Sequence, residues 1–279
     1  MTNTGLAVVR SWSAATRWSI IAATCLAAAT FVAFIQPVPQ PQAYHQFADQ
    51  RTFWGIAHSM DVLSNIAFLV PGLLGLFYVL KAGLTLDAGT RWALATLFFG
   101  LALTSVGSAY YHLDPDNQTL VFDRLPMIVA MSGALGAVIA DRFGGATAWS
   151  LAGLMTIGLW TVHEWSVTEQ LGRGDLRWYA LYQGLIFLVG ALLLALFPSR
   201  NAATAAFVIA GVGNVAAKLF EFLDKPIYAL GGVVSGHTLK HLSAGLAFLP
   251  LVFLVRRIGN QRMVEDTYRP DLASTRAGR

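Results

Sequence analysis

Eight long apolar stretches constrain this chain more than any other feature of its sequence. They cover residues 18–36, 60–81, 91–112, 126–140, 146–163, 178–197, 202–223 and 237–257. Runs of about twenty apolar residues with few charges are typical of helices that cross a membrane. Only 12% of the residues are charged, against about 25% in ordinary soluble domains. The sequence therefore predicts an all-α integral membrane protein: a seven-transmembrane helical bundle with one extra transmembrane helix at the N-terminus.

The chain divides into three parts by composition. Residues 1–43 hold the first apolar stretch, which follows two arginines and precedes a Pro-rich linker. This stretch could be a signal peptide with its exit near Ala43, but it is longer than a usual signal core, which favours an uncleaved first span. Residues 44–257 form the predicted seven-helix domain, and the polar residues 258–279 are expected to be a disordered tail.

The orientation in the membrane follows from the lysines and arginines between the spans, because cytoplasmic segments carry an excess of them. With the N-terminus inside, twelve basic residues fall on the cytoplasmic side and five on the other. Both termini are therefore expected in the cytoplasm, and the opposite side is periplasmic if the chain is bacterial.

Two local features of the spans carry structural expectations. Pro126 stands near the expected start of its helix, where its missing N–H costs little. Glycines within the spans are expected to let helices approach each other closely. These are Gly72, Gly75, Gly184, Gly190, Gly211 and Gly213.

The last span opens with two histidines four residues apart, His237 and His241. On a helix this spacing places both imidazoles on one face, one turn apart, so that they can share a metal ion. Ionisable residues within a membrane span are costly and therefore indicate function.

Further polar residues fall at the same membrane depth. His112 ends the third span, Ser108 lies one turn before it, and Asp123 precedes the fourth span. Three neutral imidazoles and one open position form a catalytic zinc site. Asp123 is then either a general base for a zinc-activated water or a residue that orients a histidine. Ser108 would hydrogen-bond that water or an oxyanion.

The ordered set Ser108-x-x-x-His112, Asp123 and His237-x-x-x-His241 resembles the alkaline ceramidases. These belong to the CREST superfamily of seven-span metal-dependent membrane hydrolases, and the resemblance covers roughly residues 44–257. It implies that the three histidines bind zinc and that Asp123 and Ser108 contact the activated water. It further implies hydrolysis of the amide of ceramide to a sphingoid base and a fatty acid.

The chain departs from this family in two respects. The first span is additional to the seven-span core. The family's eukaryotic members bind calcium near the N-terminus, where this chain offers Asp49 and Asp61 but has His58 in place of an acid. Because calcium needs about six to eight oxygen ligands, we do not expect a calcium site.

Other charged residues leave alternatives open. Lys218, Glu221 and Asp224 share one helix stripe. They form either a buried ion-pair ladder, which we favour, or a binding site for a lipid headgroup. A second group lies at the start of the sixth span and is either a rim that binds substrate or a set of interface anchors: Asp175, Arg177, Tyr179 and Gln183.

The function that these features favour is a zinc-dependent hydrolase that cleaves the amide of ceramide or a related N-acyl lipid in the membrane. The alternative is a lipid-sensing receptor of the same superfamily that holds zinc without turnover. A transporter ranks last, because the spans show no symmetry-related interrupted helices. The low charge and modest net charge of +4 give no indication of nucleic-acid binding.

Overall fold

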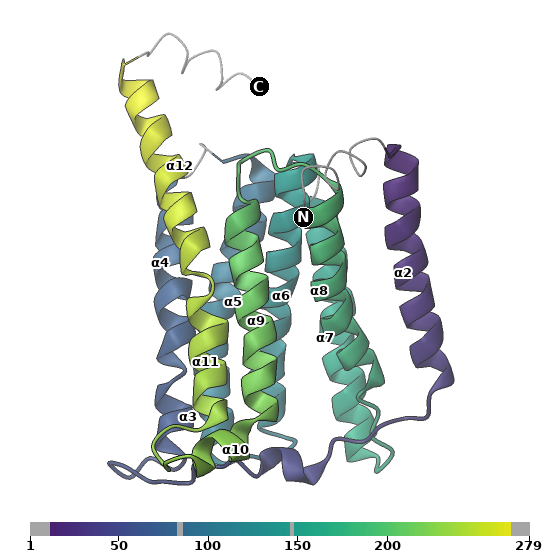
Figure 1. Cartoon of the computed structure of the whole chain (residues 1–279), viewed down its shortest axis with the longest axis vertical. Coiled ribbons are helices and arrows are strands. Elements are labelled where there is room, and N and C mark those ends of the chain that lie inside the picture. Colours follow the sequence, from purple (N-terminus) through teal and green to yellow (C-terminus); the bar gives the residue numbers. More distant parts are fainter. Residues whose placement is uncertain (1–11, 83–85, 146–147, 269–279) are drawn as a thin grey trace.

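The computed structural model describes residues 12–82, 86–145 and 148–268 of the 279-residue chain, with the side chains of 148 and 261–268 outside that description. Within these ranges the secondary structure is helical, apart from one isolated bridge between Phe53 and Ile56. Figure 1 shows the long helices side by side, with α2 at one edge and α4 and α12 at the other.

Seven spans in the described residues are long and apolar enough to cross a membrane, which confirms the predicted all-α membrane bundle. They are Ala14–Phe34 (α2), Ser59–Ala82 (α3, Ser59–Leu63, and α4, Ile66–Ala82), Ala88–Leu113 (α5), Leu120–Phe143 (α6), Arg177–Leu196 (α8), Thr204–Phe222 (α9) and Gly236–Asn260 (α11, Gly236–Leu246, and part of α12, Leu249–Tyr268).

The predicted span at 146–163 corresponds to α7 (Ala148–Gln170), which packs against α6 and α8 but is not one of these seven. Its crossing of the membrane stays a prediction. Two short helices, η1 (Gln42–His45) and α10 (Asp224–Ala229), complete the order of elements.

The bundle has two distinct ends. The short helices α3 and α10 lie at one end, here named the α3–α10 end, whereas α2 begins and α12 ends at the opposite end (Figure 1). The expected tail is partly wrong, because α12 continues to Tyr268 and residues 258–268 are therefore helical. This segment continues the helix of the apolar span directly before it. Residues 269–279 lie outside the described residues.

Two spans are broken. One break lies near the α3–α10 end, between α3 and α4, and the other lies at mid-depth, between α11 and α12. Ser64 and Asn65 separate α3 from α4, and their side chains both donate to the carbonyl oxygen of Asp61, at 3.1 and 2.8 Å. Ala247 and Phe248 separate α11 from α12. Such breaks are tolerated in a membrane where side chains satisfy the freed backbone groups.

Helix α6 begins earlier than the sequence indicates. It starts at Leu120, so Pro126 lies inside the helix and the expectation that it marks the first turn is wrong. The proline removes the hydrogen bond to the carbonyl of Phe122. That carbonyl faces Gly107 of α5, where a Cβ atom would lie only 2.0 Å from the oxygen. The close approach brings the first turn of α6 against the last part of α5, where Ser108 and His112 lie.

The six predicted glycines differ in their surroundings. Gly72, Gly75 and Gly213 lie against neighbouring helices so closely that a Cβ would collide, which confirms close packing there. Gly184 and Gly211 have nothing within 4 Å of such a Cβ, so the expectation is wrong for them, and Gly190 has one ordinary contact at 3.9 Å. The apolar pattern cannot show which side of a helix faces a neighbour.

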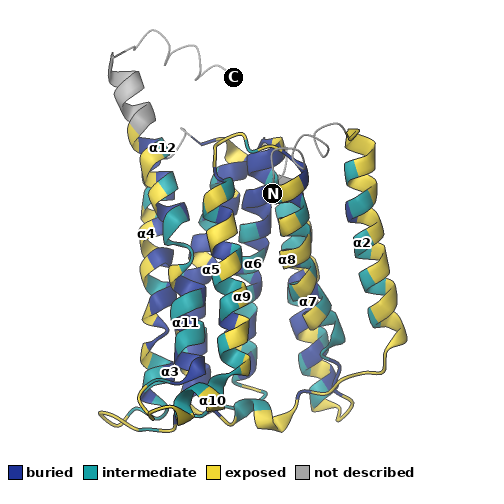
Figure 2. Cartoon of the chain, in the orientation of Figure 1, coloured by how far each residue is buried: buried dark blue, intermediate teal, exposed yellow. Residues whose placement is uncertain are grey.

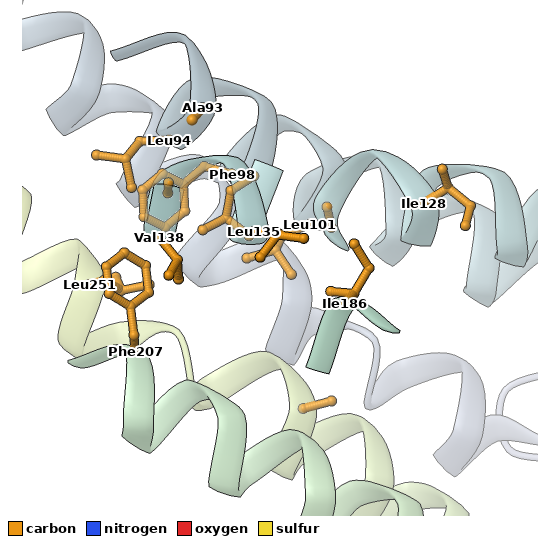
Figure 3. Packing of buried hydrophobic residues seen from close by; sticks show 14 of the residues in the cluster. Ala93, Leu94, Phe98, Leu101, Ile128, Leu135, Val138, Ile186, Phe207 and Leu251 are labelled. Carbon is orange, nitrogen blue, oxygen red and sulfur yellow. The ribbon is translucent and has the colours of Figure 1, made fainter. Parts of the chain in front are cut away.

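The core is aliphatic and aromatic and lies between α4, α5, α6, α8, α9 and α12. Figure 3 shows Phe98, Leu135 and Leu251 converging from three of these helices. In contrast, α2 is mostly exposed or half-buried along its length (Figure 2), and only 6% of its most apolar window is buried. Its exposed apolar surface suits contact with lipid.

Candidate metal centre

The start of α11 positions two of the predicted histidines. Ser235 caps the helix, its side chain accepting a hydrogen bond from the backbone N–H of Thr238 at 3.0 Å. Gly236 lies against the α9–α10 junction, where a Cβ would meet the Phe220 carbonyl oxygen at 2.3 Å. His237 and His241 therefore begin one turn apart on a buried face, and both side chains are almost inaccessible to solvent.

The third histidine comes from the last turn of α5. His112 is fully buried, and its ring centroid lies 4.7 Å from that of His237 and 5.0 Å from that of His241. One ligand nitrogen from each histidine lies within 4.8 Å of the others. The structure thus brings together all three residues that the sequence singles out as metal ligands.

The spacing of the nitrogens fits one metal ion. His112 Nε2 and His237 Nε2 are 3.2 Å apart. Two imidazole nitrogens bound to one tetrahedral zinc at about 2.0–2.1 Å are separated by about 3.3 Å. His241 Nε2 is buried and has no hydrogen-bond partner. A buried nitrogen left unpaired is costly, and a metal ion is one partner that would remove this cost.

A neighbouring hydroxyl fixes the orientation of the His241 ring. Ser64 Oγ lies 2.8 Å from His241 Nδ1, which leaves Nε2 of that ring directed at the other two histidines. His58 Nδ1 lies 3.0 Å from the carbonyl oxygen of His112. Burial lowers the pKa of His58, which keeps this imidazole neutral near pH 7. Hydrogen bonds that orient metal-binding histidines are a usual part of such sites.

The linker after α2 covers the three histidines at the α3–α10 end. Phe47 is 5% exposed, and its ring centroid lies 4.6 Å from that of His112 and 4.4 Å from that of His237. Asp224 holds this segment to α11, because its carboxylate accepts hydrogen bonds from the backbone N–H groups of Ala48, at 2.9 Å, and of His237, at 2.8 Å. Phe47 therefore shields the site from water at this end.

A cavity of about 650 Å³ reaches the site at His241. Ser108, Asp123, Lys240 and His241 line its polar end. The remaining wall is largely apolar and comes from α4, α5, α6, α8, α9 and α11. The structure thus places the predicted water-activating residues beside the predicted metal ligands.

Ion pairs join α9 to α11 at this polar end. Glu221 accepts from Lys218 and from Lys240, each at 2.7 Å, and also from the Tyr44 hydroxyl at 3.1 Å. The favoured ladder is confirmed only as an ion pair between Lys218 and Glu221; it is not buried, since the Lys218 side chain is 55% exposed. The inclusion of Asp224 in this ladder is wrong, because α9 ends at Phe222 and Asp224 begins α10 in a new direction.

Three of the four predicted residues at the start of α8, Asp175, Arg177 and Tyr179, lie outside the cavity lining. Asp175 pairs with Arg177 at 2.7 Å, and the Arg177 guanidinium also donates to the carbonyl oxygen of Ile35 at the end of α2. The hydrogen bonds from Arg177 lower the pKa of Asp175. Tyr179 packs under the buried Arg124 guanidinium and accepts from Gln183, whose side chain lines the cavity. Asp175 and Arg177 therefore fasten α2 to the bundle.

The acidic residues considered for calcium have other partners. Both carboxylate oxygens of Asp49 accept from Arg51, at 2.8 and 2.5 Å, and Asp61 accepts from the Thr238 hydroxyl at 2.9 Å. Neither belongs to the metal-holding group found among the described residues, which consists of the three histidines. These contacts do not fit a site of six or more oxygen ligands.

Sequence reasoning assigned no role at the site to Ser64, Phe47 or Lys240. The interrupted apolar run at Ser64-Asn65 is the one local signal for the first of these. Phe47 and Lys240 have no such signal, because their positions depend on how the linker and α9 pack. Comparison with protein families, with curated proteins and with solved structures finds no match.

Proposed function

We propose that this protein is a zinc-dependent amide hydrolase of the membrane, which cleaves the N-acyl amide of ceramide or a related long-chain lipid. One observation carries the proposal: three buried histidines converge, and one of them, His241, lines the polar end of a largely apolar cavity together with Ser108 and Asp123. The products would be a fatty acid and a sphingoid base or another amine.

The cavity suits a long acyl chain. Its lining along α6 runs from Asp123 to Val138, a helix length of about 22 Å. This exceeds the hydrocarbon thickness of one leaflet, about 15 Å. An acyl chain that occupies the apolar part would leave its amide at the polar end, against Asp123 and His241.

His112, His237 and His241 would hold the zinc ion. Zinc at such a site acts as a Lewis acid toward a carbonyl oxygen and lowers the pKa of a bound water to about 7. Imidazole binds zinc, copper, nickel and iron, and three histidines with one open position are the arrangement of a catalytic zinc site. The Ser64 contact to His241 holds one donor nitrogen in place before the metal arrives.

Asp123 would move the proton in the reaction. Its carboxylate takes a proton from the attacking water as the new C–O bond forms. It then gives this proton to the amide nitrogen as the C–N bond breaks, so that the amine leaves neutral. Ser108 lines the same polar end of the cavity as Asp123 and, once substrate is bound, would donate to the carbonyl oxygen as it gains negative charge.

The proposed orientation places the reaction near the outer face of the membrane. All five site residues lie toward the α3–α10 end, whereas α2 begins and α12 ends at the opposite end. The lysine and arginine distribution favours a cytoplasmic location for that opposite end. The α3–α10 end would then face the periplasm in a bacterial cell.

The experiment is a hydrolysis assay of the purified, zinc-loaded protein in lipid nanodiscs with a panel of N-acyl lipids that includes ceramides. We expect release of free fatty acid that Asp123→Asn abolishes while the zinc content stays unchanged. Zinc without turnover of any amide in the panel would contradict the hydrolase and favour a lipid sensor that holds zinc.

A further inference from the structure

Two lysines, Lys218 and Lys240, line the polar end of the cavity, and neither the proposed metal site nor the proposed reaction uses them. Lys240 is near the centre of the site, its Nζ 3.5 Å from His237 Nε2, and its side chain is 13% exposed. Lys218 lies on α9 with a 55% exposed side chain. Both ammonium groups therefore face the same space as Asp123 and His241.

One carboxylate serves both lysines. Glu221 accepts from Lys240 through Oε1 and from Lys218 through Oε2, and Oε1 also accepts from Tyr44. Each ammonium has three N–H donors. Lys218 and Lys240 therefore retain N–H donors that Glu221 and His237 do not satisfy.

The position of the lysines defines which part of a substrate meets them. The opposite end of the cavity is lined by apolar side chains such as Val138, Leu194 and Phe207. An acyl chain that fills this part directs the amine side of the amide toward Lys218 and Lys240. A charged group here is costly unless a partner of opposite charge is present.

We propose that the preferred substrate is an acidic N-acyl lipid, which carries a carboxylate or a phosphate on the amine side of the amide, and that Lys218 and Lys240 bind this anion. This inference rests on the proposed function for the position of the amide. It goes beyond that function by naming the charge of the headgroup. Lysine is a common point-charge partner of phosphate and carboxylate groups.

The test measures binding to the metal-free protein, so that it is separate from turnover. N-palmitoylglycine is compared with its neutral analogue N-palmitoylethanolamine, and ceramide phosphate with ceramide, by thermophoresis in a neutral detergent. In at least one of the two pairs, we expect the anionic ligand to bind at least about tenfold more tightly than its neutral partner. The pair that shows this difference identifies whether the lysines bind a carboxylate or a phosphate. Equal affinity within both pairs overturns the proposal.

Variants assign the preference to the two lysines. Lys218→Met and Lys240→Met should each reduce the anionic preference several-fold, whereas Lys225→Met, an exposed lysine on α10 outside this cavity, should leave it unchanged. A preference that persists in Lys218→Met/Lys240→Met overturns the assignment. If Lys240→Met does not fold, the half-exposed Lys218 still provides the test. A preference without hydrolysis of any lipid contradicts the proposed function alone.

Discussion

Ser64 Oγ lies 2.8 Å from Nδ1 of His241, at the point where the second span is broken between α3 and α4. The break therefore has a structural consequence for the candidate metal centre. It places a hydroxyl beside Nδ1 of the buried ring. Nε2 of the same ring has no hydrogen-bond partner. The irregular backbone and the metal site are two aspects of one arrangement.

Ser64→Ala should weaken zinc binding by about 10–100-fold, because the hydrogen bond that orients the His241 ring is lost. Competition with a zinc chelator of known affinity measures the effect. Ser132→Ala is a matched control. Ser132 is also buried, but it lies farther along α6 and forms hydrogen bonds with the Ile128 carbonyl and with Tyr182 of α8. Equal zinc affinity of wild type and Ser64→Ala would remove Ser64 from the site.

Asp123→Asn should lower kcat by about 10²–10⁴-fold and leave the zinc content unchanged, because the amide has the shape of the carboxylate but cannot accept the proton. Steady-state kinetics and elemental analysis of the same preparation measure both quantities. Asp116→Asn changes a carboxylate in the loop before α6 and should not affect turnover. Normal turnover of Asp123→Asn would exclude Asp123 as the base.

Phe47→Ala should speed the removal of zinc by a water-soluble chelator, because the ring that covers His112 and His237 is lost. Phe47→Leu should have a smaller effect, since it retains most of the apolar cover. Trp54→Ala removes an aromatic ring that is 87% exposed and should leave the rate unchanged. The same chelation rate in wild type and Phe47→Ala would show that zinc leaves by another route.

Asp175→Asn should destabilise the attachment of α2 near neutral pH. It should also make the stability of the protein depend less steeply on pH under acidic conditions. The pKa of Asp175 is lowered in the folded protein by Arg177, so the unfolded chain binds more protons as the pH falls below about 3.9. The stabilisation is present above that pH and is lost as the pH falls through the folded pKa. The measurement is thermal unfolding at a series of pH values from about 3 to 7. Identical dependence of stability on pH in wild type and Asp175→Asn would contradict this role of Asp175.

The spans and the three histidines could be predicted because their signals are local. Apolar runs of membrane length and the four-residue spacing of His237 and His241 need no knowledge of packing. His112 could be predicted as a ligand because it ends a span at the same membrane depth as the other two histidines. The start of α6 could not be predicted, since Leu120 begins a helix before the strongest apolar run and Pro126 is accommodated by Gly107 of another helix.

Contacts between distant segments were beyond reach of the sequence. Phe47 reaches the histidines only because the linker crosses the α3–α10 end, and Asp224 leaves its expected stripe because α9 ends two residues before it. Lys240 has no local signal in the sequence, and its position beside the site is set by its ion pair with Glu221 on α9. Pairings of this kind depend on tertiary packing, which a single sequence does not encode in any local pattern.

Metal analysis of the purified protein by mass spectrometry measures whether His112, His237 and His241 bind zinc. We expect about one zinc per chain in wild type and none above background in His241→Ala. Zinc-free wild-type protein after reconstitution with zinc, or full zinc content in His237→Ala/His241→Ala, would contradict this expectation.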